Sequence, residues 1–163
     1  MEKINLYIDF DGVILDTITP LYDEIKEKQI PEDKQKEFFV NYDWKQIIKD
    51  TNIINDSINS IKKIIDSDKF NLAILTHVNS LYEAEQKIHY LRKYFKDITI
   101  IPCPKTISKT KMVHTKDSIL IDDYAGNLRE WEQENGIPVR FSRKNNGKGF
   151  KVINKLDQII QMF

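Results

Sequence analysis

Short runs of apolar, mainly β-branched residues alternate with segments of helical periodicity along most of this chain. The runs have about four to six residues and are nearly continuous in apolarity, which is typical of strands buried on both faces of a parallel sheet. They are Ile4–Ile8, Asn71–Leu75, Ile98–Ile101, Ser118–Ile121 and Pro138–Phe141.

Amphipathic segments between these runs predict helices. In Ser80–Phe95, Ser80 and Glu83 have the spacing of a capping box. Further helices are expected over Asn127–Asn135 and Leu156–Met162. Because strands alternate with helices, we expect right-handed crossovers and an α/β sheet. The apolar stripe predicted for the first of these helices consists of Leu81, Ala84, Ile88, Leu91 and Phe95.

The segment 17–69 breaks this alternation because it contains no convincing strand. Its apolar residues recur at helical spacings, and about fifty residues is too long for a single crossover helix. We therefore predict a small helical cap, made of residues 17–69 and inserted directly after the first strand. Residues 1–16 and 70–163 would form the core.

Composition narrows the class of protein. The 163 residues carry 25 Lys+Arg and 25 Asp+Glu, which gives a formal net charge of zero. This balance argues against binding polymeric nucleic acid or a membrane surface by bulk charge. The one cysteine, Cys103, excludes an intrachain disulfide, and we expect it to be a small buried residue. The sequence shows neither a secretion signal nor an apolar stretch of ~18 residues, so we expect a cytoplasmic location.

Polar side chains follow three of the predicted strands. Asp9 and Asp11 follow the first, Thr76 the second, and Asp122 and Asp123 the fourth. Because ligands bind beyond the carboxyl ends of strands in open α/β sheets, four carboxylates are expected to converge there. A hard divalent cation would offset their mutual repulsion, and a few carboxylates with waters and a phosphate suit Mg²⁺. One such aspartate alone is usually a turn residue or N-cap, but this ordered combination is far more specific.

These motifs resemble those of the haloacid dehalogenase (HAD) superfamily of phosphohydrolases. Asp9-Phe10-Asp11-Gly12-Val13 is similar to its first motif, Leu75-Thr76 to its second and Ile121-Asp122-Asp123 to its fourth. The resemblance spans Ile4 to about Phe141. It implies a three-layer α/β/α, Rossmann-like core with a parallel sheet and a small helical cap after the first strand.

A narrower resemblance lies around the fourth motif. Leu120-Ile121-Asp122-Asp123, followed by Asn127-Leu128 and Trp131, resembles the 5'(3')-deoxyribonucleotidase-like members. This implies a Mg²⁺-dependent phosphatase, monomeric or homodimeric, that acts on a deoxyribonucleoside monophosphate. A phosphosugar phosphatase or mutase is the alternative enzyme. A non-catalytic phosphate-binding domain is the other alternative, and the intact Asp9 and Asp11 argue against it.

The resemblance also implies a role for each site residue. Asp9 would be the nucleophile that forms an aspartyl-phosphate, and Asp11 the general acid and then the base. Asp9, the backbone carbonyl of Asp11 and Asp122 would bind Mg²⁺, with Asp123 as a ligand or support. The hydroxyl of Thr76 would donate a hydrogen bond to a phosphoryl oxygen. The alternative is that Thr76 only caps the following helix.

The third motif of the superfamily is a lysine, for which several residues before the fourth strand qualify. We prefer Lys109, because Ser108 would cap a helical turn that Met112 and Val113 complete as buried residues, and because the pattern resembles phage relatives. Lys111 is the next choice. The remaining candidates are Lys105 and Lys116.

Two further features leave alternatives open. His77, beside Thr76, could face the substrate or be structural or exposed. The predicted cap carries an aromatic cluster that could stack on a nucleobase, although aromatic residues at helical spacing are more often the core of such a cap. The cluster consists of Phe38, Phe39, Tyr42 and Trp44.

Overall fold

A parallel six-stranded sheet organises the protein, whose computed structural model describes residues 2–163. Its strand order is β3-β2-β1-β4-β5-β6, so β1 lies at the centre between β2 and β4. The five predicted strands are confirmed, with shifted ends, and the short β6 adds to them. The strands are β1 (Ile4–Ile8), β2 (Phe70–Val78), β3 (Thr99–Pro104), β4 (Ile119–Asp122), β5 (Ile137–Phe141) and β6 (Lys151–Ile153).

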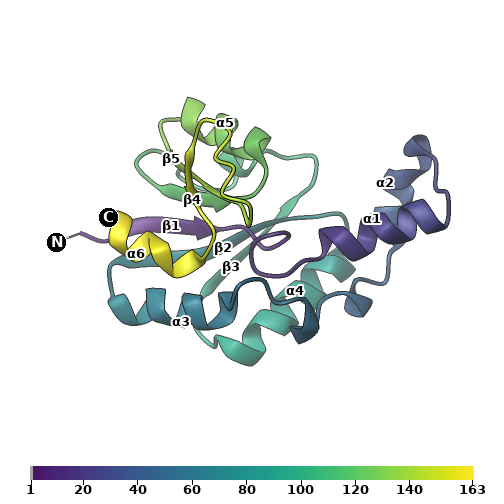
Figure 1. The fold of residues 1–163 in the computed structure, drawn as a ribbon, viewed down its shortest axis with the longest axis horizontal. Helices are drawn as coiled ribbons and strands as arrows, with labels where there is room; N and C mark the ends of the chain where they lie inside the picture. The colour runs from purple at the N-terminus through teal and green to yellow at the C-terminus, as the bar shows by residue number, and fades with distance from the viewer. Residues whose placement is uncertain (1) are drawn as a thin grey trace.

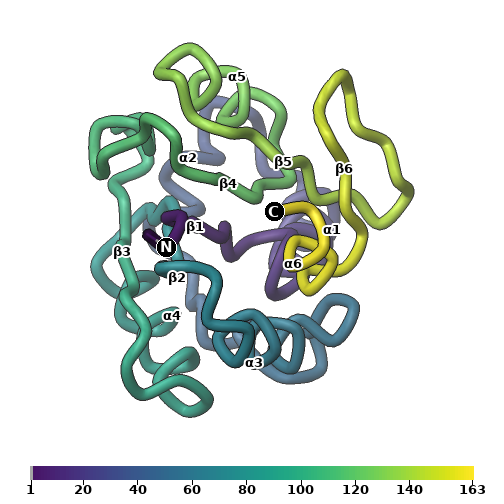
Figure 2. The backbone as a smooth tube through the Cα atoms, turned by 90° about the vertical axis from the view of Figure 1, so that its left-hand side faces the viewer, coloured from purple at the N-terminus to yellow at the C-terminus, as the bar shows by residue number. Residues whose placement is uncertain are grey.

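Helices cover both faces of this sheet, which confirms the predicted three-layer α/β arrangement. Helices α3 (Ser57–Ser67) and α4 (Leu81–Tyr94) lie on one face, and α5 (Ala125–Gln133) lies on the other (Figures 1 and 2). The short η4 (Leu156–Gln158) and α6 (Ile159–Met162) pack against α3. None of the helices in residues 2–163 is both long and apolar enough to cross a membrane.

The core is divided by the sheet into a large and a small cluster. The large cluster lies between β1 and the α3–α4 layer and includes the fully buried Leu6, Ile8 and Ile61. The small cluster lies under α5, where the indole N–H of Trp131 donates to the backbone carbonyl of Ser118 at 2.9 Å. Cys103 belongs to this second cluster and is fully buried, as predicted.

Helices inserted after β1 are confirmed, and most of them extend beyond the carboxyl ends of the strands (Figure 1). They are α1 (Ile18–Glu27), α2 (Glu32–Asn41) and the 3-10 turns η1 (Trp44–Gln46) and η2 (Asp50–Asn52). Helix α3 also falls within the predicted cap segment. However, it contributes Ile58, Ile61 and Ile64 to the core and packs against β2 and α6. The part of the segment that extends beyond the sheet is therefore residues 18–52, which we call the insertion.

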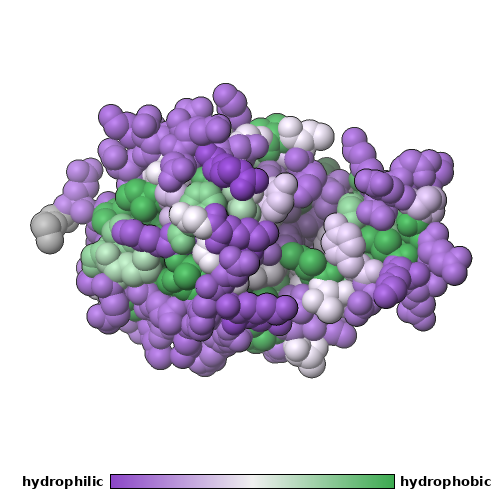
Figure 3. All heavy atoms as spheres, turned by 45° about the horizontal axis from the view of Figure 1, so that its top comes forward, coloured by the Kyte–Doolittle hydropathy of each residue, from purple (hydrophilic) through white to green (hydrophobic). Residues whose placement is uncertain are grey.

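The aromatic residues of the insertion pack mainly on one another. Tyr42 and Trp44 are buried, and the Tyr42 ring lies 5.3 Å from that of Phe38 and 5.4 Å from that of Trp44. Phe39 packs edge-on against Phe38. These side chains form the core of the insertion. Of the two roles considered for them, the core of a cap or a stack on a nucleobase, the contacts within the protein favour the first. In Figure 3 the surface is hollowed between the insertion, at the right, and the rest of the molecule.

The predicted apolar stripe of α4 is wrong at its first position. Ser80 caps the helix as expected, since its hydroxyl accepts the Glu83 N–H at 3.1 Å, but Leu81 is 88% exposed. The Glu83 carboxylate reaches the Asn79 N–H at 2.7 Å rather than that of Ser80. The face that α4 buries instead includes the charged pair Glu83 and Lys87.

Candidate active site

The strand register brings the predicted polar residues together at one edge of the sheet. Ile8 pairs with Ile74 of β2 and with Ile121 of β4, so the residues that follow these three positions are neighbours. The Asp9 N–H donates to the Ile121 carbonyl at 2.9 Å, which holds the chain after β1 against β4. Thr76 lies within β2 rather than after it, because β2 continues to Val78.

Three carboxylates form a compact cluster at this edge. Asp9, Asp122 and Asp123 each offer an oxygen, and these oxygens lie within 4.8 Å of one another. Burial, and then repulsion from Asp9 and Asp122, raises the pKa of Asp123 to about 9. Burial, followed by the charge of Asp122, likewise raises the pKa of Asp9 to about 7. All three carboxylates are therefore ionised together at neutral pH only when further positive charge is present.

Lys109 already places one positive charge against the cluster, and the pKa of Asp9 is raised in spite of it. Lys109 is the first residue of the 3-10 turn η3 (Lys109–Lys111) and is 2% exposed. Its Nζ lies 2.8 Å from Oδ1 of Asp9 and 2.7 Å from Oδ2 of Asp122. Burial acts to lower the pKa of Lys109, but the Asp122 and Asp9 carboxylates outweigh it and raise the pKa above its usual value. The group is therefore an ammonium at physiological pH.

The other candidate lysines do not reach the cluster. Lys111, Lys105 and Lys116 are exposed. One reason given for preferring Lys109 is wrong, because Met112 is 37% exposed and does not anchor the turn. Ser108 holds the turn instead, since its hydroxyl accepts from the Thr110 N–H and donates to Glu130 of α5 at 2.6 Å.

Asp122 is fixed by donors on both of its oxygens. Its Oδ1 accepts the Tyr124 N–H at 2.9 Å, and its Oδ2 accepts from the Asn127 side-chain amide at 3.0 Å. Burial would raise the pKa of Asp122, but Lys109 and these donors outweigh it and lower the pKa. Asn127 therefore orients a carboxylate of the cluster. In the sequence, Asn127 stood out only as part of the stretch that resembles the deoxyribonucleotidase-like proteins.

Gly12 gives the chain the turn that follows Asp11. Its φ of +75° lies in the left-handed region, and its N–H donates to the Leu15 carbonyl at 2.8 Å. A Cβ at this position would lie 2.3 Å from Oδ2 of Asp123. Only glycine therefore fits both the backbone conformation and the close approach of the carboxylate.

The Asp11 carboxylate is not one of the three clustered groups and has partners of its own. Its Oδ1 accepts from the Thr17 hydroxyl at 2.6 Å, and its Oδ2 lies 2.6 Å from Nζ of Lys87. The metal contact expected for Asp11 is through its backbone carbonyl, so it does not compete with these two contacts of the carboxylate.

Lys87 is the residue that sequence reasoning missed. It is fully buried on α4, and its Nζ lies 2.9 Å from the Thr76 hydroxyl and 2.6 Å from Glu83. Burial acts to lower the pKa of Lys87, but Asp11 and Glu83 outweigh it and raise the pKa. A signal was available, because Glu83 and Lys87 have i,i+4 spacing on the same face as Ala84 and Leu91.

Thr76 and His77 have distinct environments. Thr76 is 1% exposed and does not cap α4, since Ser80 has that role. Nε2 of His77 lies 2.8 Å from the Ile107 carbonyl, and burial lowers the pKa of this histidine. This partner favours a structural role for His77.

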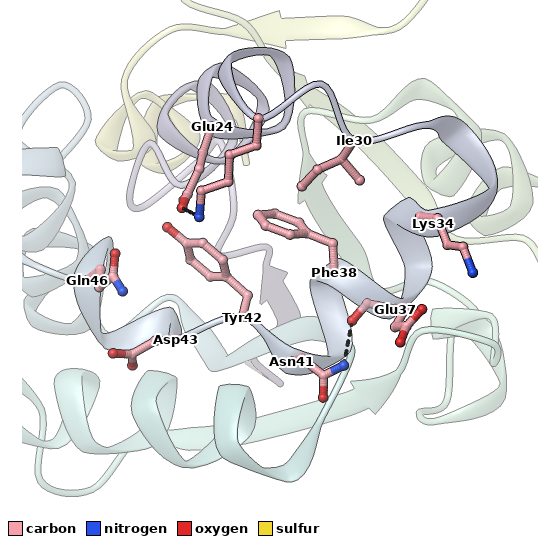
Figure 4. A pocket seen from close by; sticks show the side chains of 10 residues that line it. Glu24, Ile30, Lys34, Glu37, Phe38, Asn41, Tyr42, Asp43 and Gln46 are labelled. Atoms are coloured by element: carbon pink, nitrogen blue, oxygen red, sulfur yellow. Dashed lines mark hydrogen bonds and ion pairs between the residues drawn. The ribbon is translucent and has the colours of Figure 1, made fainter.

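A separate cavity lies inside the insertion (Figure 4). It has a volume of about 390 Å³, lies between α1, α2 and η1, and is lined in part by the rings of Phe38 and Tyr42. None of the carboxylate-cluster residues lines it within the described chain. Its remaining lining residues are Glu24, Lys28, Ile30, Lys34, Glu37, Asn41, Asp43 and Gln46.

No protein-family model matches the sequence, and no curated protein matches it either. Solved structures do match the fold. The HAD hydrolase YfnB of Bacillus subtilis, bound to magnesium, has a TM-score of 0.61 at 13% identity, covering 99% of each chain. The HAD phosphatase of Thermococcus onnurineus has a TM-score of 0.62 at 15% identity, covering 98% of this chain and 97% of that one.

The chain has the HAD fold. A third match, β-phosphoglucomutase of Clostridium difficile, has a TM-score of 0.64 at 15% identity and covers 99% of this chain and 96% of that one. At these identities the HAD likeness concerns the fold, and the chemistry must be argued from the residues of this chain.

Proposed function

We propose that this protein is a Mg²⁺-dependent phosphomonoester hydrolase that works through an aspartyl-phosphate on Asp9. The observation that supports it best is the buried cluster of Asp9, Asp122 and Asp123 with Lys109 bridging two of its members. Three buried carboxylates beside a single ammonium repel one another and destabilise the folded state, unless a bound cation neutralises them.

Mg²⁺ fits these residues because it prefers carboxylate and carbonyl oxygens together with water and phosphate. Asp9, Asp122, Asp123 and the backbone carbonyl of Asp11 would hold it. When bound, the ion offsets the charge of the cluster and of the transferring phosphoryl group.

In the first step, a carboxylate oxygen of Asp9 attacks phosphorus and the ester P–O bond breaks. Asp11 donates its proton to the leaving oxygen, which departs as an alcohol. Lys109 makes two of its three possible donations to Asp9 and Asp122, so one N–H is available for a phosphoryl oxygen. The Thr76 hydroxyl would supply a second neutral donor to the same group.

In the second step, Asp11 acts as the base. Its carboxylate takes a proton from a water molecule whose oxygen attacks phosphorus, and the P–O bond to Asp9 breaks. Inorganic phosphate leaves, Asp9 is again a carboxylate, and Asp11 again carries its proton.

The insertion is positioned to select the leaving group. It follows directly after the catalytic turn and extends past the strand ends that carry the cluster (Figure 1). Asp43 of the insertion accepts a hydrogen bond from the Tyr82 hydroxyl at 2.7 Å, which connects the insertion with helix α4. Residues 18–52 would thus act as the cap, with α3 part of the core.

A deoxyribonucleoside monophosphate is the leading substrate. The support is the resemblance of Leu120–Asp123, Asn127-Leu128 and Trp131 to deoxyribonucleotidase-like proteins. A sugar phosphate is the second candidate, because the fold also matches the β-phosphoglucomutase of Clostridium difficile.

A panel of phosphomonoesters tests the proposal. Nucleoside and deoxynucleoside monophosphates, hexose phosphates, glycerol phosphate and p-nitrophenyl phosphate are incubated with Mg²⁺ or with chelator, and released phosphate is measured. We expect release only with Mg²⁺ and fastest from a deoxynucleotide. Transfer between hydroxyls of a bisphosphorylated hexose would favour the mutase, and no release from any ester would refute the hydrolase.

A further inference from the structure

Lys87 contacts four acceptors of the protein and has only three N–H groups. Its Nζ lies 2.6 Å from Asp11, 2.6 Å from Glu83, 2.9 Å from the Thr76 hydroxyl and 3.0 Å from the His77 carbonyl. An ammonium has three donors, so none remains for a substrate. Lys87 therefore differs from Lys109, which keeps one donor free of the contacts described.

Glu83 holds Lys87 in this position from behind. The Glu83 side chain is 1% exposed, and its Oε1 accepts from the backbone N–H of Asn79 at 2.7 Å and from the side-chain amide of that residue at 3.0 Å. Its Oε2 pairs with Lys87. Since Asn79 lies in the short connection between β2 and α4, the ammonium is fixed to the backbone beside Thr76.

Aromatic rings cover the remaining side of Lys87. Its Nζ lies 5.2 Å from the centroid of the Phe10 ring and 5.8 Å from that of the Trp44 ring in the insertion. In the sequence, Phe10 stands between Asp9 and Asp11. The Lys87 ammonium is fully buried, all three of its N–H groups have acceptors in the protein, and two aromatic rings lie over it. It therefore cannot turn toward a ligand.

We propose that Lys87, anchored by Glu83, is a positioning residue that fixes the Asp11 carboxyl group and the Thr76 hydroxyl relative to the phosphoryl site. With Thr17 on Oδ1 and Lys87 on Oδ2, both oxygens of Asp11 are held, so the plane of the carboxyl group is set. On Thr76, Lys87 donates to the hydroxyl oxygen and so fixes its position, while the hydroxyl proton makes only a long bond of 3.3 Å to the His77 carbonyl, which a phosphoryl oxygen would replace. This inference rests on the proposed hydrolase and on the role of Asp11 in it.

The leaving group of the substrate provides the test. p-Nitrophenolate departs without a proton, whereas an alkoxide needs one from Asp11. In Lys87→Met we expect the ratio of kcat/KM for the best alkyl ester of the panel to kcat/KM for p-nitrophenyl phosphate to fall by about 100-fold, because kcat/KM covers only the steps up to departure of the leaving group. Asp11→Asn should lower the same ratio. A loss of phosphoryl binding through Thr76 slows both esters equally and so cancels in the ratio. A loss of folded protein cancels in the ratio for the same reason.

Three further variants make the test specific. Lys93→Met, an exposed lysine on the same helix, is the matched control and should leave the ratio unchanged. Glu83→Gln weakens the anchor while keeping Lys87, so the ratio should fall here too, which covers the case in which Lys87→Met does not fold. In the double variant Asp11→Asn with Lys87→Met, the ratio should be no lower than in Asp11→Asn alone.

Two outcomes separate this inference from the proposed function. If the wild-type protein releases phosphate and Asp11→Asn lowers the ratio, but Lys87→Met and Glu83→Gln do not, Lys87 is structural and the inference is overturned while the hydrolase stands. If the wild-type protein hydrolyses no ester with Mg²⁺, both fail together.

Discussion

Nζ of Lys109 lies 2.8 Å from Oδ1 of Asp9, although 100 positions separate the two residues in the chain. Both side chains are buried. Asp9 directly follows strand β1, and Lys109 begins the turn η3, which follows strand β3. The contact brings a permanent positive charge to the proposed nucleophile before any ligand binds.

Lys109→Met should reduce kcat by about 10²–10³-fold, because a donor to the charge that develops on the phosphoryl group is lost. Lys111→Met is the matched control, since Lys111 is exposed on the same short turn, and it should remain within about twofold of wild type. Steady-state kinetics of both variants with the same ester decide the matter. A crippled Lys111 variant beside an active Lys109 variant would overturn the assignment of the lysine.

Asp9→Asn should reduce turnover by at least about 10³-fold, because an amide cannot form the aspartyl-phosphate. The substitution keeps the volume and removes one of three crowded carboxyl groups, so the melting temperature in chelator should not fall. Kinetics and thermal unfolding measure the two effects. Activity within about tenfold of wild type would exclude the covalent mechanism.

Mg²⁺ should raise the melting temperature more at pH 8.5 than at pH 5.5. In the protein alone, burial and repulsion raise the pKa of Asp123 to about 9 and that of Asp9 to about 7. Both lie above the unfolded values of about 4, so the folded state binds more protons and the free energy of unfolding falls as pH rises from about 4 to 9. A bound cation removes this loss.

The difference between melting temperatures with Mg²⁺ and with chelator, measured across pH, tests this. Groups whose titration does not depend on the charges of the cluster cancel in the difference. Asp123→Asn should flatten the pH dependence in chelator, because the amide does not ionise. A stabilisation by Mg²⁺ that is independent of pH in this range would show that the carboxylates do not bind the ion together.

Gly12→Ala should destabilise the protein and weaken Mg²⁺ binding. The left-handed backbone costs a residue with a Cβ about 1–2 kcal/mol, and here the Cβ would also displace the Asp123 carboxylate. Gly149→Ala is the control, because Gly149 has φ +92° and no atom within 4 Å of an added Cβ. Both variants should melt earlier than wild type, but calorimetry should find weakened Mg²⁺ binding only for Gly12→Ala.

The strands and the carboxylate edge could be predicted because each depends on a local pattern. A buried parallel strand is a continuous apolar run, and aspartates that end such runs must meet once the strands are adjacent. By contrast, helical spacing alone does not say what a helix packs against. For this reason α3 was grouped with the cap, although Ile61 and Ile64 face the sheet. The three-residue β6 was too short to produce a pattern.

The polar face of α4 was missed for a different reason. Charged side chains on a helix usually face solvent, and this default outweighs the weaker signal from the i,i+4 spacing of Glu83 and Lys87 on the apolar face. What buries them is the position of Asp11, which lies 76 residues before Lys87 in the chain. Only the tertiary structure brings these three side chains together.

The central position of β1 has a consequence for the synthesis of the protein. β1 leaves the ribosome long before either of its partners, since Ile8 pairs with Ile74 and with Ile121. Leu6 and Ile8, fully buried in the finished sheet, reach that burial only once β4 has been translated and paired with β1. Such non-local pairing is slow and leaves apolar segments open to aggregation until β4 emerges.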